Sequence, residues 1–407
     1  MLFVYNIGLR IYSLLVRQAA YFNPKAKQWV KGRKEQSLVR YNSSIWFHFA
    51  SLGEFEQGRP VLEKTRALYP AKAIVITFFS SSGYEVRKDY PLADAVYYLP
   101  LDTRANAIKF IDTINPEIAL FTKYEYWYHY FNQLHKKSIP LYIISGVFRS
   151  EQIFFKWYGN LHRKMLSCVT HFFLQDQNSK LLLKTIGLQN TTVSGDTRFD
   201  RVWENAMQPN HFEGIAKFTE GRKTIICGST WPADEALLTA MVSDYPHLKF
   251  IFVPHEINED KIARLLNTLP EKNAIRYSHI DDHTDDLPLL QTLIIDNIGM
   301  LSSLYQYGYL AYIGGGFGVG IHNTLEAAAF GLPVIFGPNY AKFKEAADLI
   351  AHGAGFSIGN EQELRNTIDN LSSDAALYSF AATNAKMYVE DHQGATNIII
   401  KHIYPGN

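Results

Sequence analysis

Residues 314–338 read GGGFGVGIHNTLEAAAFGLPVIFGP, and the fold can be worked out from this stretch. The apolar run Leu310–Ile313 precedes the glycines, a segment of helical composition follows at His322–Phe330, and Leu332–Phe336 is apolar again. Strand, glycine loop, helix and strand in this order are typical of a parallel βαβ unit. Backbone N–H groups of such a loop can approach a phosphate closely, and the helix start adds positive charge. The stretch therefore predicts a phosphate-binding turn in an α/β domain.

The spacing within the loop separates it from two common nucleotide motifs. A dinucleotide fingerprint lies on the first βα turn of its domain, and a P-loop ends in Gly-Lys-Ser/Thr, which this loop does not. Asn323 and Glu326 share one helical face beside the loop, so Glu326 can bind ribose hydroxyls while the loop holds the phosphate. The alternative is a glycine-rich turn needed for tight packing, with Glu326 only stabilising the first turn of its helix.

The rest of the chain repeats this alternation of buried strands and helices. Apolar runs occur at 45–49, 73–79, 95–99, 117–121 and 141–144, and again at 224–227, 250–253, 293–296, 310–313 and 332–336. Such runs between helices predict two doubly wound, Rossmann-like α/β domains, which we expect to face each other across a cleft. The polar stretch 208–222 marks the boundary, so we expect domains at 35–207 and 208–373, with helical residues 374–407 returning to the first.

Composition limits the class of protein. Hydrophobic residues make up 47% and charged residues 19% of 407, which excludes a disordered or multi-span membrane chain. Lys plus Arg is 40 and Asp plus Glu is 39, so nucleic acid is not an expected partner. The two cysteines, Cys168 and Cys227, fit a reducing compartment. The dense cluster His279–Asp286 is interpreted as a solvated loop, so we expect neither a metal ion nor a cofactor.

The N-terminal segment predicts contact with a membrane surface. Its longest uncharged run, Met1–Leu9, is too short to span a bilayer. Arg10 and Arg17 share one helical face, and the basic stretch Lys25–Lys34 follows. An apolar helix beside a basic cluster suits an anionic bilayer surface, so residues 1–34 are expected to form a membrane-associated helix and basic segment. The alternative is a first helix that packs on the core of the protein.

Together, these motifs resemble a known family. The Gly314–Pro338 stretch is similar to the donor site of GT-B glycosyltransferases, and more specifically to that of Kdo transferases, which move 3-deoxy-D-manno-octulosonic acid (Kdo) from CMP-Kdo to the lipid A precursor. The resemblance also rests on HFASLGE at 48–54, EYW at 125–127, SGDTRFD at 194–200, GST at 228–230 and NIG at 297–299. It covers nearly the whole chain.

The resemblance implies an inverting, metal-independent transferase of lipopolysaccharide biosynthesis. It would act as a peripheral protein on the cytoplasmic face of the inner membrane and transfer Kdo from CMP-Kdo to lipid IVA. Two readings from other classes remain open: a UDP-sugar epimerase of the same architecture, and a non-catalytic lipid A precursor-binding protein. The N-terminal segment argues against the first, and retention of Glu54 and Arg198 argues against the second.

Three residues are the catalytic candidates. An inverting transfer needs a base for the acceptor hydroxyl, and the family's proposed base corresponds to Glu54. Glu125 would orient a substrate, and Arg198 would neutralise the leaving phosphate or the sugar carboxylate. Ser51, Gly53 and Lys123 are expected on the acceptor side. The structural alternatives are a first-turn helix acid for Glu54, pairing with Lys123 or Arg149 for Glu125, and pairing with Asp196 or Asp200 for Arg198.

The donor is expected to contact strand ends in the second domain. The candidates are Ser229, Thr230, Pro254, His255, Ile298, Gly299, Met300, Gly314, Gly315, Gly316, Gly320, Asn323 and Glu326. Ser229 and Thr230 are expected to open a helix, where ordinary N-capping is the alternative. The chain departs from the family in two places. His255 stands where Arg usually follows the Pro, and residues 123–129, KYEYWYH, replace E-T-E-x-W-P-N.

Overall fold

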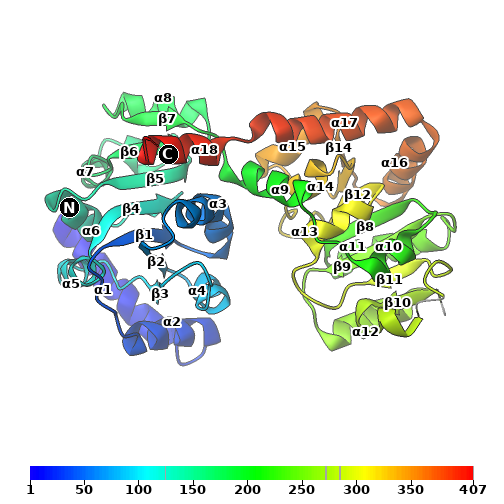
Figure 1. Cartoon of the computed structure of the whole chain (residues 1–407), viewed down its shortest axis with the longest axis horizontal. Helices are drawn as coiled ribbons and strands as arrows, with labels where there is room; N and C mark the ends of the chain where they lie inside the picture. The colour runs from blue at the N-terminus through cyan, green and yellow to red at the C-terminus, as the bar shows by residue number, and fades with distance from the viewer. Residues whose placement is uncertain (124, 271–272, 284–285, 407) are drawn as a thin grey trace. The chain divides into compact units, whose positions relative to one another are not determined.

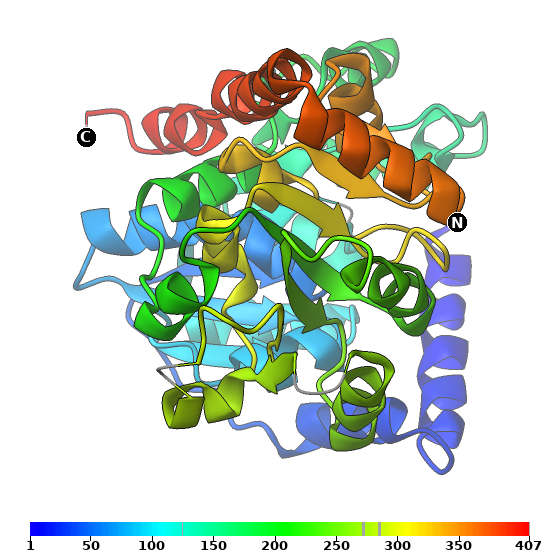
Figure 2. The same ribbon diagram turned by 90° about the vertical axis from the view of Figure 1, so that its right-hand side faces the viewer.

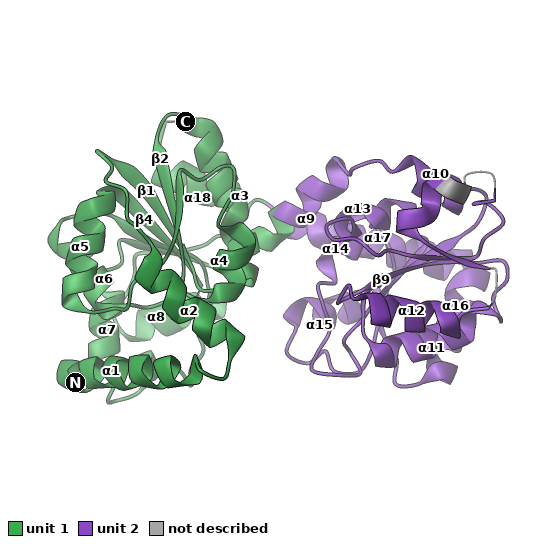
Figure 3. Ribbon diagram, turned by 90° about the horizontal axis from the view of Figure 1, so that it is seen from below, with its two compact units in different colours: residues 1–200, 394–407 green, residues 201–393 purple. Residues whose placement is uncertain are grey.

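The computed structural model describes residues 1–123, 125–270, 273–283 and 286–406. It divides into two compact units (Figure 3). Unit 1 contains Met1–Asp200 and Gly394–Asn407, and unit 2 contains Arg201–Gln393. Each unit has one seven-stranded sheet in which every strand pairing is parallel, with helices on both faces (Figure 1). The predicted class, two Rossmann-like α/β domains, is confirmed.

The sheet of unit 1 has the strand order β3-β2-β1-β4-β5-β6-β7. Its strands are β1 Ser44–Phe49, β2 Ala73–Phe78, β3 Ala95–Tyr98, β4 Pro116–Thr122, β5 Leu141–Gly146, β6 His171–Leu174 and β7 Thr191–Val193. Its helices are α1 Leu2–Ala19, α2 Pro24–Glu35, α3 Leu52–Leu68, α4 Ser81–Arg87, α5 Arg104–Ile114, α6 Tyr128–Lys136, α7 Asn160–Leu166, α8 Gln177–Thr185 and α18 Ala395–Ile403, with the short turn η1 Ile153–Phe155. Helix α9, Thr197–Met207, crosses the boundary between the units.

The central strand β1 shows why this sheet is buried on both faces. All six residues of SIWFHF are buried, and successive side chains point to opposite faces. Trp46 packs in the core on one face, with α5 and α6, whereas Phe47 and Phe49 pack on the other face, with α3 and α18. His48 points to the same face as Trp46 and is also fully buried. A polar side chain therefore lies inside the sheet, close to the end of its central strand.

The sheet of unit 2 has the order β10-β11-β9-β8-β12-β13-β14. Its strands are β8 Thr224–Thr230, β9 Lys249–Pro254, β10 Ala274–Arg276, β11 Thr292–Ile294, β12 Leu310–Ile313, β13 Val334–Phe336 and β14 Gly355–Ser357. Its helices are α10 Glu213–Thr219, α11 Pro232–Val242, α12 Glu259–Thr268, α13 Leu301–Leu304, α14 Leu325–Ala329, α15 Lys344–Ala351, α16 Glu361–Ser373 and α17 Ala375–His392, with short turns η2 Tyr277–His283 and η3 Tyr305–Tyr307.

Both sheets reverse their strand order beside the first strand of the unit. In unit 1 the chain runs from β1 outward to β3 and then returns to β4 on the other side of β1. In unit 2 it runs from β8 outward and returns to β12 on the other side of β8. In open parallel sheets, ligands bind beyond the carboxyl ends of the strands at such a switch point. The fold therefore directs attention to the ends of β1 and β4, and of β8 and β12.

The ten predicted strands correspond to β1–β5, β8, β9 and β11–β13. Four strands of three or four residues, β6, β7, β10 and β14, were not predicted. The expected segment 374–407 is divided between the units, since α17 lies in unit 2 and α18 in unit 1. Helix α18 is anchored by Asp200, whose carboxylate accepts from the backbone N–H of Thr396 at 2.7 Å and from its hydroxyl at 2.6 Å.

The N-terminal helix α1 lies along the outside of unit 1 (Figures 2 and 3). Its inner face is fixed by polar contacts. The hydroxyl of Tyr5 donates to the buried Asp102 at 2.5 Å, and Asn6 Oδ1 lies 2.7 Å from His129 Nε2. Its outer face exposes an apolar stripe of Phe3, Val4, Ile7, Ile11, Leu14 and Leu15. Within the described residues, no helix combines the length and apolar character needed to cross a bilayer.

Candidate functional site

Glu54 lies at the switch point of unit 1. Strand β1 ends at Phe49 and α3 begins at Leu52, so Glu54 sits in the first turn of the helix. Its Oε2 accepts the backbone N–H of Ala50 at 2.6 Å. This bond, four residues back along the chain, fixes the carboxylate over the end of the strand. The first-turn role that was the structural alternative is therefore present, and it orients the side chain without using its other oxygen.

The pKa of Glu54 is subject to opposing effects, and in the structure those that raise it are the larger. Burial and repulsion from Glu125 raise its pKa from 4.5 to about 7, although the Ala50 N–H and the positive charge of Lys123 act in the other direction. Desolvation disfavours the charged form of a carboxyl group, and a second carboxylate nearby adds to this effect. The pKa of Glu54 therefore lies where a carboxylate can accept a proton at neutral pH.

Glu125 follows β4 and is held by two side chains. Its Oε2 lies 3.2 Å from His48 Nε2 and accepts the indole N–H of Trp127 at 2.8 Å. The other imidazole nitrogen of His48 lies 2.8 Å from the hydroxyl of Thr77, so the ring is fixed at both ends. The structural alternative predicted that Glu125 pairs with Lys123 or Arg149, but its partners are His48 and Trp127. His48 belongs to a motif quoted from the sequence, but its position inside a strand gave no indication of this contact.

The predicted acceptor-side residues lie around the same strand ends. Ser51 is the N-cap residue of α3, and Gly53 is exposed in its first turn. Lys123 directly follows β4 and has a left-handed backbone with φ of 61°. Such backbone strain in a residue other than glycine is concentrated at functional sites. Tyr124, within the altered 123–129 segment, lies outside the described residues.

Arg198 pairs with Asp196, one of its two expected structural partners. Its Nε donates to Asp196 Oδ2 at 2.9 Å, and its own backbone N–H donates to Oδ1 at 2.9 Å. Gln57, one turn beyond Glu54 on α3, also donates to Asp196 Oδ1 at 2.8 Å. Despite burial, these bonds lower the pKa of Asp196 and keep it anionic. The guanidinium is thus held next to the helix that carries Glu54, but its positive charge is partly neutralised.

The glycine loop of unit 2 is packed against its neighbours along the backbone. A Cβ atom on Gly314 would lie 2.3 Å from the carbonyl oxygen of Ser229, and one on Gly316 would lie 2.5 Å from Gly337 Cα. Gly315 has φ of 93° and Gly320 has φ of 140°, so both use a backbone region that favours glycine. The packing role of the loop, which was the structural alternative, therefore applies to these four glycines.

A buried carboxylate that sequence reasoning missed holds the loop in place. Asp234, which is 1% exposed, accepts from the Gly315 N–H at 2.9 Å, the Tyr312 hydroxyl at 2.8 Å and the Trp231 N–H at 2.9 Å. The last bond is part of a capping box at the start of α11. Asp234 thus ties the end of β8 to the loop after β12. A Trp-Pro-x-Asp sequence after a strand was the available signal.

The predicted helix start at Ser229 and Thr230 is wrong. Both residues belong to β8, and α11 begins at Pro232 because Pro favours the first position of a helix. Ser229 has a left-handed backbone with φ of 53°. Thr230 is buried and donates its hydroxyl to Glu235 at 3.1 Å. The strand end therefore points its backbone, rather than a capping hydroxyl, toward the glycine loop.

Three aromatic rings stack beside this strand end. The indole of Trp231 lies 4.7 Å from the ring of His255, which lies 4.3 Å from the ring of His322. Trp231 Nε1 donates to His322 Nε2 at 2.9 Å, which requires that nitrogen to be unprotonated. Burial, and next the neighbouring His255, lowers the pKa of His322. Pro254 is buried at the end of β9, and the exposed His255 follows it as the middle ring of the stack.

Asn323 and Glu326 contact each other, as their spacing predicted. The amide of Asn323 donates to Glu326 Oε1 at 3.0 Å, and its Oδ1 accepts the Leu325 N–H at 3.1 Å. After β11, Ile298 is 90% exposed, Gly299 has φ of 96° and Met300 is buried. The predicted donor residues thus lie at the carboxyl ends of β8 and β9, in the segments that follow β9, β11 and β12, and in the first turn of α14. The four strands are neighbours in one sheet.

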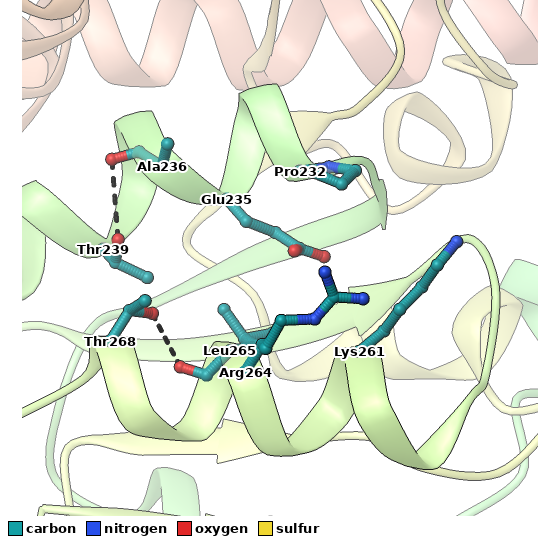
Figure 4. A pocket seen from close by; sticks show the side chains of 8 residues that line it. All are labelled: Pro232, Glu235, Ala236, Thr239, Lys261, Arg264, Leu265 and Thr268. Atoms are coloured by element: carbon teal, nitrogen blue, oxygen red, sulfur yellow. Dashed lines mark hydrogen bonds between the residues drawn. The ribbon is translucent and has the colours of Figure 1, made fainter.

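A small cavity of about 180 Å³ in unit 2 shares no lining residue with the predicted donor residues (Figure 4). All of its lining residues come from α11 and α12, and Figure 4 shows the carboxylate of Glu235 facing the guanidinium of Arg264. Burial raises the pKa of Glu235. Of the described residues, no group of three His, Cys, Asp or Glu side chains is arranged to hold a metal ion. Thr284 and Asp285 of the predicted solvated loop lie outside the described residues.

Sequence comparisons with known proteins point to one family. The family model for 3-deoxy-D-manno-octulosonic-acid transferase (kdotransferase) matches residues 21–201. The 3-deoxy-D-manno-octulosonic acid transferase of Chlamydia muridarum is 27% identical over 342 residues, covering 81% of this chain and 78% of that protein. The transferase of the same name from Aquifex aeolicus is 26% identical over 351 residues, covering 83% and 89%.

Among solved structures, the UDP-GlcNAc 2-epimerase from Neisseria meningitidis bound to UDP-GlcNAc is similar with a TM-score of 0.61. The identity is 15%, and the match covers 88% of this chain and 99% of that chain. This likeness shows the fold alone. Since the relatives in sequence are transferases, the epimerase alternative is not favoured.

Proposed function

Since the chain is a glycosyltransferase of the Kdo transferase family, we propose that it transfers Kdo from CMP-Kdo to lipid IVA, the lipid A precursor, in lipopolysaccharide biosynthesis. The proposal includes inversion at the sugar carbon and chemistry without a metal ion. The observation that carries it is the carboxylate of Glu54 at the switch point of unit 1, with a pKa raised to about 7.

Glu54 is the proposed general base. The oxygen of an acceptor hydroxyl bonds to the anomeric carbon of Kdo, the bond from that carbon to the CMP phosphate breaks, and the hydroxyl proton passes to Glu54. The Ala50 N–H holds Oε2 at 2.6 Å, and Oε1 is the oxygen proposed to take the proton. Since its pKa is about 7, the carboxylate is substantially ionised at neutral pH and is still basic enough to take the proton.

The end of β8 and the glycine loop are proposed to bind the CMP leaving group. The close packing of Gly314 and Gly316 leaves backbone rather than side chains at the switch point of unit 2. Backbone N–H groups there can stabilise the negative charge that develops on the departing phosphate. Glu326 would bind the ribose hydroxyls, and Arg198 would add positive charge near the reacting carbon.

Lys123 is the proposed contact for an anionic group of a substrate. It replaces the first acid of the family segment, and it lies close enough to Glu54 to lower the pKa of that carboxyl group. The donor carries a carboxylate and the acceptor carries phosphates, so both provide suitable anions. Because Lys123 lies close to the proposed base, we propose that it contacts an anion near the reacting atoms. That anion is an acceptor phosphate or the donor carboxylate.

We further propose that the protein is peripheral to the cytoplasmic face of the inner membrane through residues 1–34. The apolar stripe of α1 supports this, because its six side chains are between 38% and 75% exposed. The inner face of the same helix is anchored to unit 1 by Tyr5 and Asn6. The helix can therefore lie flat on a bilayer with its outer face in the interface while unit 1 stays in water.

One assay tests the transfer. The full-length protein is incubated with CMP-Kdo and tetra-acylated lipid A precursor, and CMP release and product mass are measured together. We expect stoichiometric CMP release and a lipid product heavier by one or more Kdo residues. Lipid binding without CMP release would instead support the non-catalytic alternative. Conversion of UDP-GlcNAc in a parallel reaction would support the epimerase alternative.

Vesicle sedimentation tests the membrane contact. Removing residues 1–22 is expected to release much of the protein from anionic vesicles while CMP affinity is retained. High salt should release the full-length protein only partly, because the apolar contribution is not screened. A folded truncated protein that still sediments fully would contradict the proposal, as would truncation that acts only by unfolding unit 1.

A further inference from the structure

We infer that unit 1 contains a binding site for the phosphomonoester of an anionic headgroup, in a groove between α1, α2 and the segment that joins β3 to α5. Three adjoining cavities of about 510, 480 and 530 Å³ form this groove. The first and second share Ser13, Arg17 and Leu101, and the first and third share Arg33 and Lys34. We call it the basic groove.

The charges that line the basic groove are all of one sign. Its basic side chains are Arg10, Arg17, Arg33, Lys34 and Lys109. Of the described residues that line the three cavities, none is Asp or Glu. Concave surfaces with one sign of charge concentrate ligands of the opposite sign. Since the whole chain has a net charge of only +1, this local excess is not a result of overall composition.

Arg33 is the strongest single indication of an anionic ligand. Its guanidinium donates to the carbonyl oxygens of Leu99 at 2.9 Å and Phe79 at 2.7 Å, and it lies 3.7 Å from the ring centroid of Trp29. Its Nη1 also donates to the carbonyl oxygen of Trp29 at 3.4 Å, and within the described part of the chain no carboxylate forms an ion pair with it. Burial lowers its pKa to about 9, which means that the charged form is destabilised by desolvation. A bound anion would stabilise that charged form.

The other donors match a phosphate group. Arg17 and Ser13 line the first cavity from α1, and Lys34 lines it from α2. A guanidinium can donate two parallel hydrogen bonds to phosphate oxygens, and an ammonium and a hydroxyl can each add one. Cavities of this size accommodate a phosphate together with part of the sugar or glycerol that carries it.

The position of the groove favours a lipid headgroup as the source of the phosphate. Leu14 lines the groove and also belongs to the exposed apolar stripe of α1. A headgroup in the groove would therefore lie beside side chains suited to the apolar part of a bilayer. This last step rests on the proposed membrane contact, whereas the recognition of phosphate does not.

Two double variants test the site. Arg17→Gln with Lys34→Gln removes two charges from the groove, and Lys25→Gln with Lys27→Gln removes two charges from α2 outside it. Binding is measured to phosphatidylcholine vesicles containing either phosphatidic acid, a phosphomonoester, or phosphatidylglycerol, a diester, matched in surface charge. We expect the wild type and the Lys25/Lys27 variant to prefer phosphatidic acid, and the Arg17/Lys34 variant to lose that preference. Each charge removed should weaken overall binding about fivefold in both variants.

Inorganic phosphate separates the two sources of the ligand. A phosphate-dependent rise in the Tm of the full-length protein that disappears only in the Arg17/Lys34 variant supports the site and shows that the phosphate group alone is sufficient. Equal preference of the wild type for the two lipids, or the same loss of preference in both variants, would overturn the inference. Failure of the wild type to bind any vesicle would contradict the membrane contact, and the phosphate measurement would then decide the groove.

Discussion

The two sheets place very different chemistry at equivalent points. At the switch point of unit 1, side chains converge: Glu54 and Glu125 follow adjacent strands, Glu125 raises the pKa of Glu54, and His48 and Lys123 lie beside them. At the switch point of unit 2, the backbone converges, because Gly314 and Gly316 leave no room for side chains. The carboxylate that is buried there, Asp234, has all its partners inside the unit.

This difference separates reactivity from recognition. A group that changes its protonation state during a reaction works best with a pKa near the working pH, and burial together with Glu125 gives Glu54 such a pKa. A surface that receives a phosphate does best with fixed N–H dipoles, which need no reorganisation when charge develops. A fold used twice in one chain thus provides a proton acceptor in one unit and a preorganised anion site in the other.

The largest expected effect is on the reactive side of this comparison. Glu54→Gln retains the shape and the acceptor oxygen for the Ala50 N–H but cannot take a proton. We expect transfer to fall by about 10²–10⁴-fold, the range for loss of a general base, while CMP affinity is nearly unchanged. Single-turnover rates and calorimetry measure the two quantities. Turnover similar to wild type would exclude Glu54 as the base.

The next effect is on the recognition side. Glu326→Ala should weaken CMP binding by about 1.5–3 kcal/mol, the range for hydrogen bonds to a charged group. The variant also loses the hydrogen bond from Asn323, which precedes the helix, and we expect it to stay folded. Calorimetry with CMP measures the change. Unchanged affinity in a folded variant would limit Glu326 to a role in its helix.

The packing of the glycine loop can be tested with a matched pair. Gly314→Ala places a Cβ 2.3 Å from a carbonyl oxygen, whereas Gly318→Ala places one 3.6 Å from its nearest neighbour. We expect the first to lower the free energy of unfolding by about 1–3 kcal/mol and to weaken CMP binding, and the second to be tolerated. Urea denaturation provides the comparison. Equal stability of the two variants would show that the backbone around Gly314 can shift to accommodate the added Cβ.

The smallest effect concerns pH. The pKa of Glu54 is raised in the folded state from 4.5 to about 7, so between these values the unfolded chain releases a proton that the folded protein keeps. Stability from this group is therefore highest below pH 4.5 and falls as the pH rises toward 7. Glu54→Gln should stabilise the protein at pH 8 relative to pH 5, by on the order of 1–3 kcal/mol.

The rate of transfer should move in the opposite direction. Only the ionised carboxylate of Glu54 accepts a proton, so the rate is expected to rise with pH through about 7. Parallel profiles of rate and unfolding for the wild type and Glu54→Gln provide the check. A rate that is independent of pH between 6 and 8 would contradict this assignment of the titrating group.

The sequence predicted the features that depend on local pattern. Ten strands were found because their apolar runs are bounded by Gly, Pro or polar residues, and the Asn323–Glu326 pair follows from helical spacing. The strands β7, β10 and β14 were missed because three residues at or near a sheet edge carry no periodicity. The helix start after β8 was misplaced because Pro232 and Asp234, rather than Ser229 and Thr230, determine it.

Other features depend on contacts between distant segments. His48 meets Glu125 across 77 positions of sequence, and Tyr312 meets Asp234 across 78. The balance of burial and charge at Glu54 likewise depends on two segments, the turn between β1 and α3 and the residues that follow β4. Local composition cannot determine such pairs, so the partners of the candidate site residues could not be predicted from the sequence.

The return of α18 to unit 1 has a consequence for how the chain can be divided. Unit 2 is inserted into unit 1, because the chain leaves at Asp200 and comes back at Gly394. Ile399, Ile400 and Ile403 share a core with Phe55 and Leu62 of α3. A fragment that stops near residue 200 would therefore expose an apolar strip and leave the carboxylate of Asp200 without its capping role. Unit 2 is one continuous segment of the chain, whereas unit 1 alone requires residues 1–200 to be linked to residues 394–407.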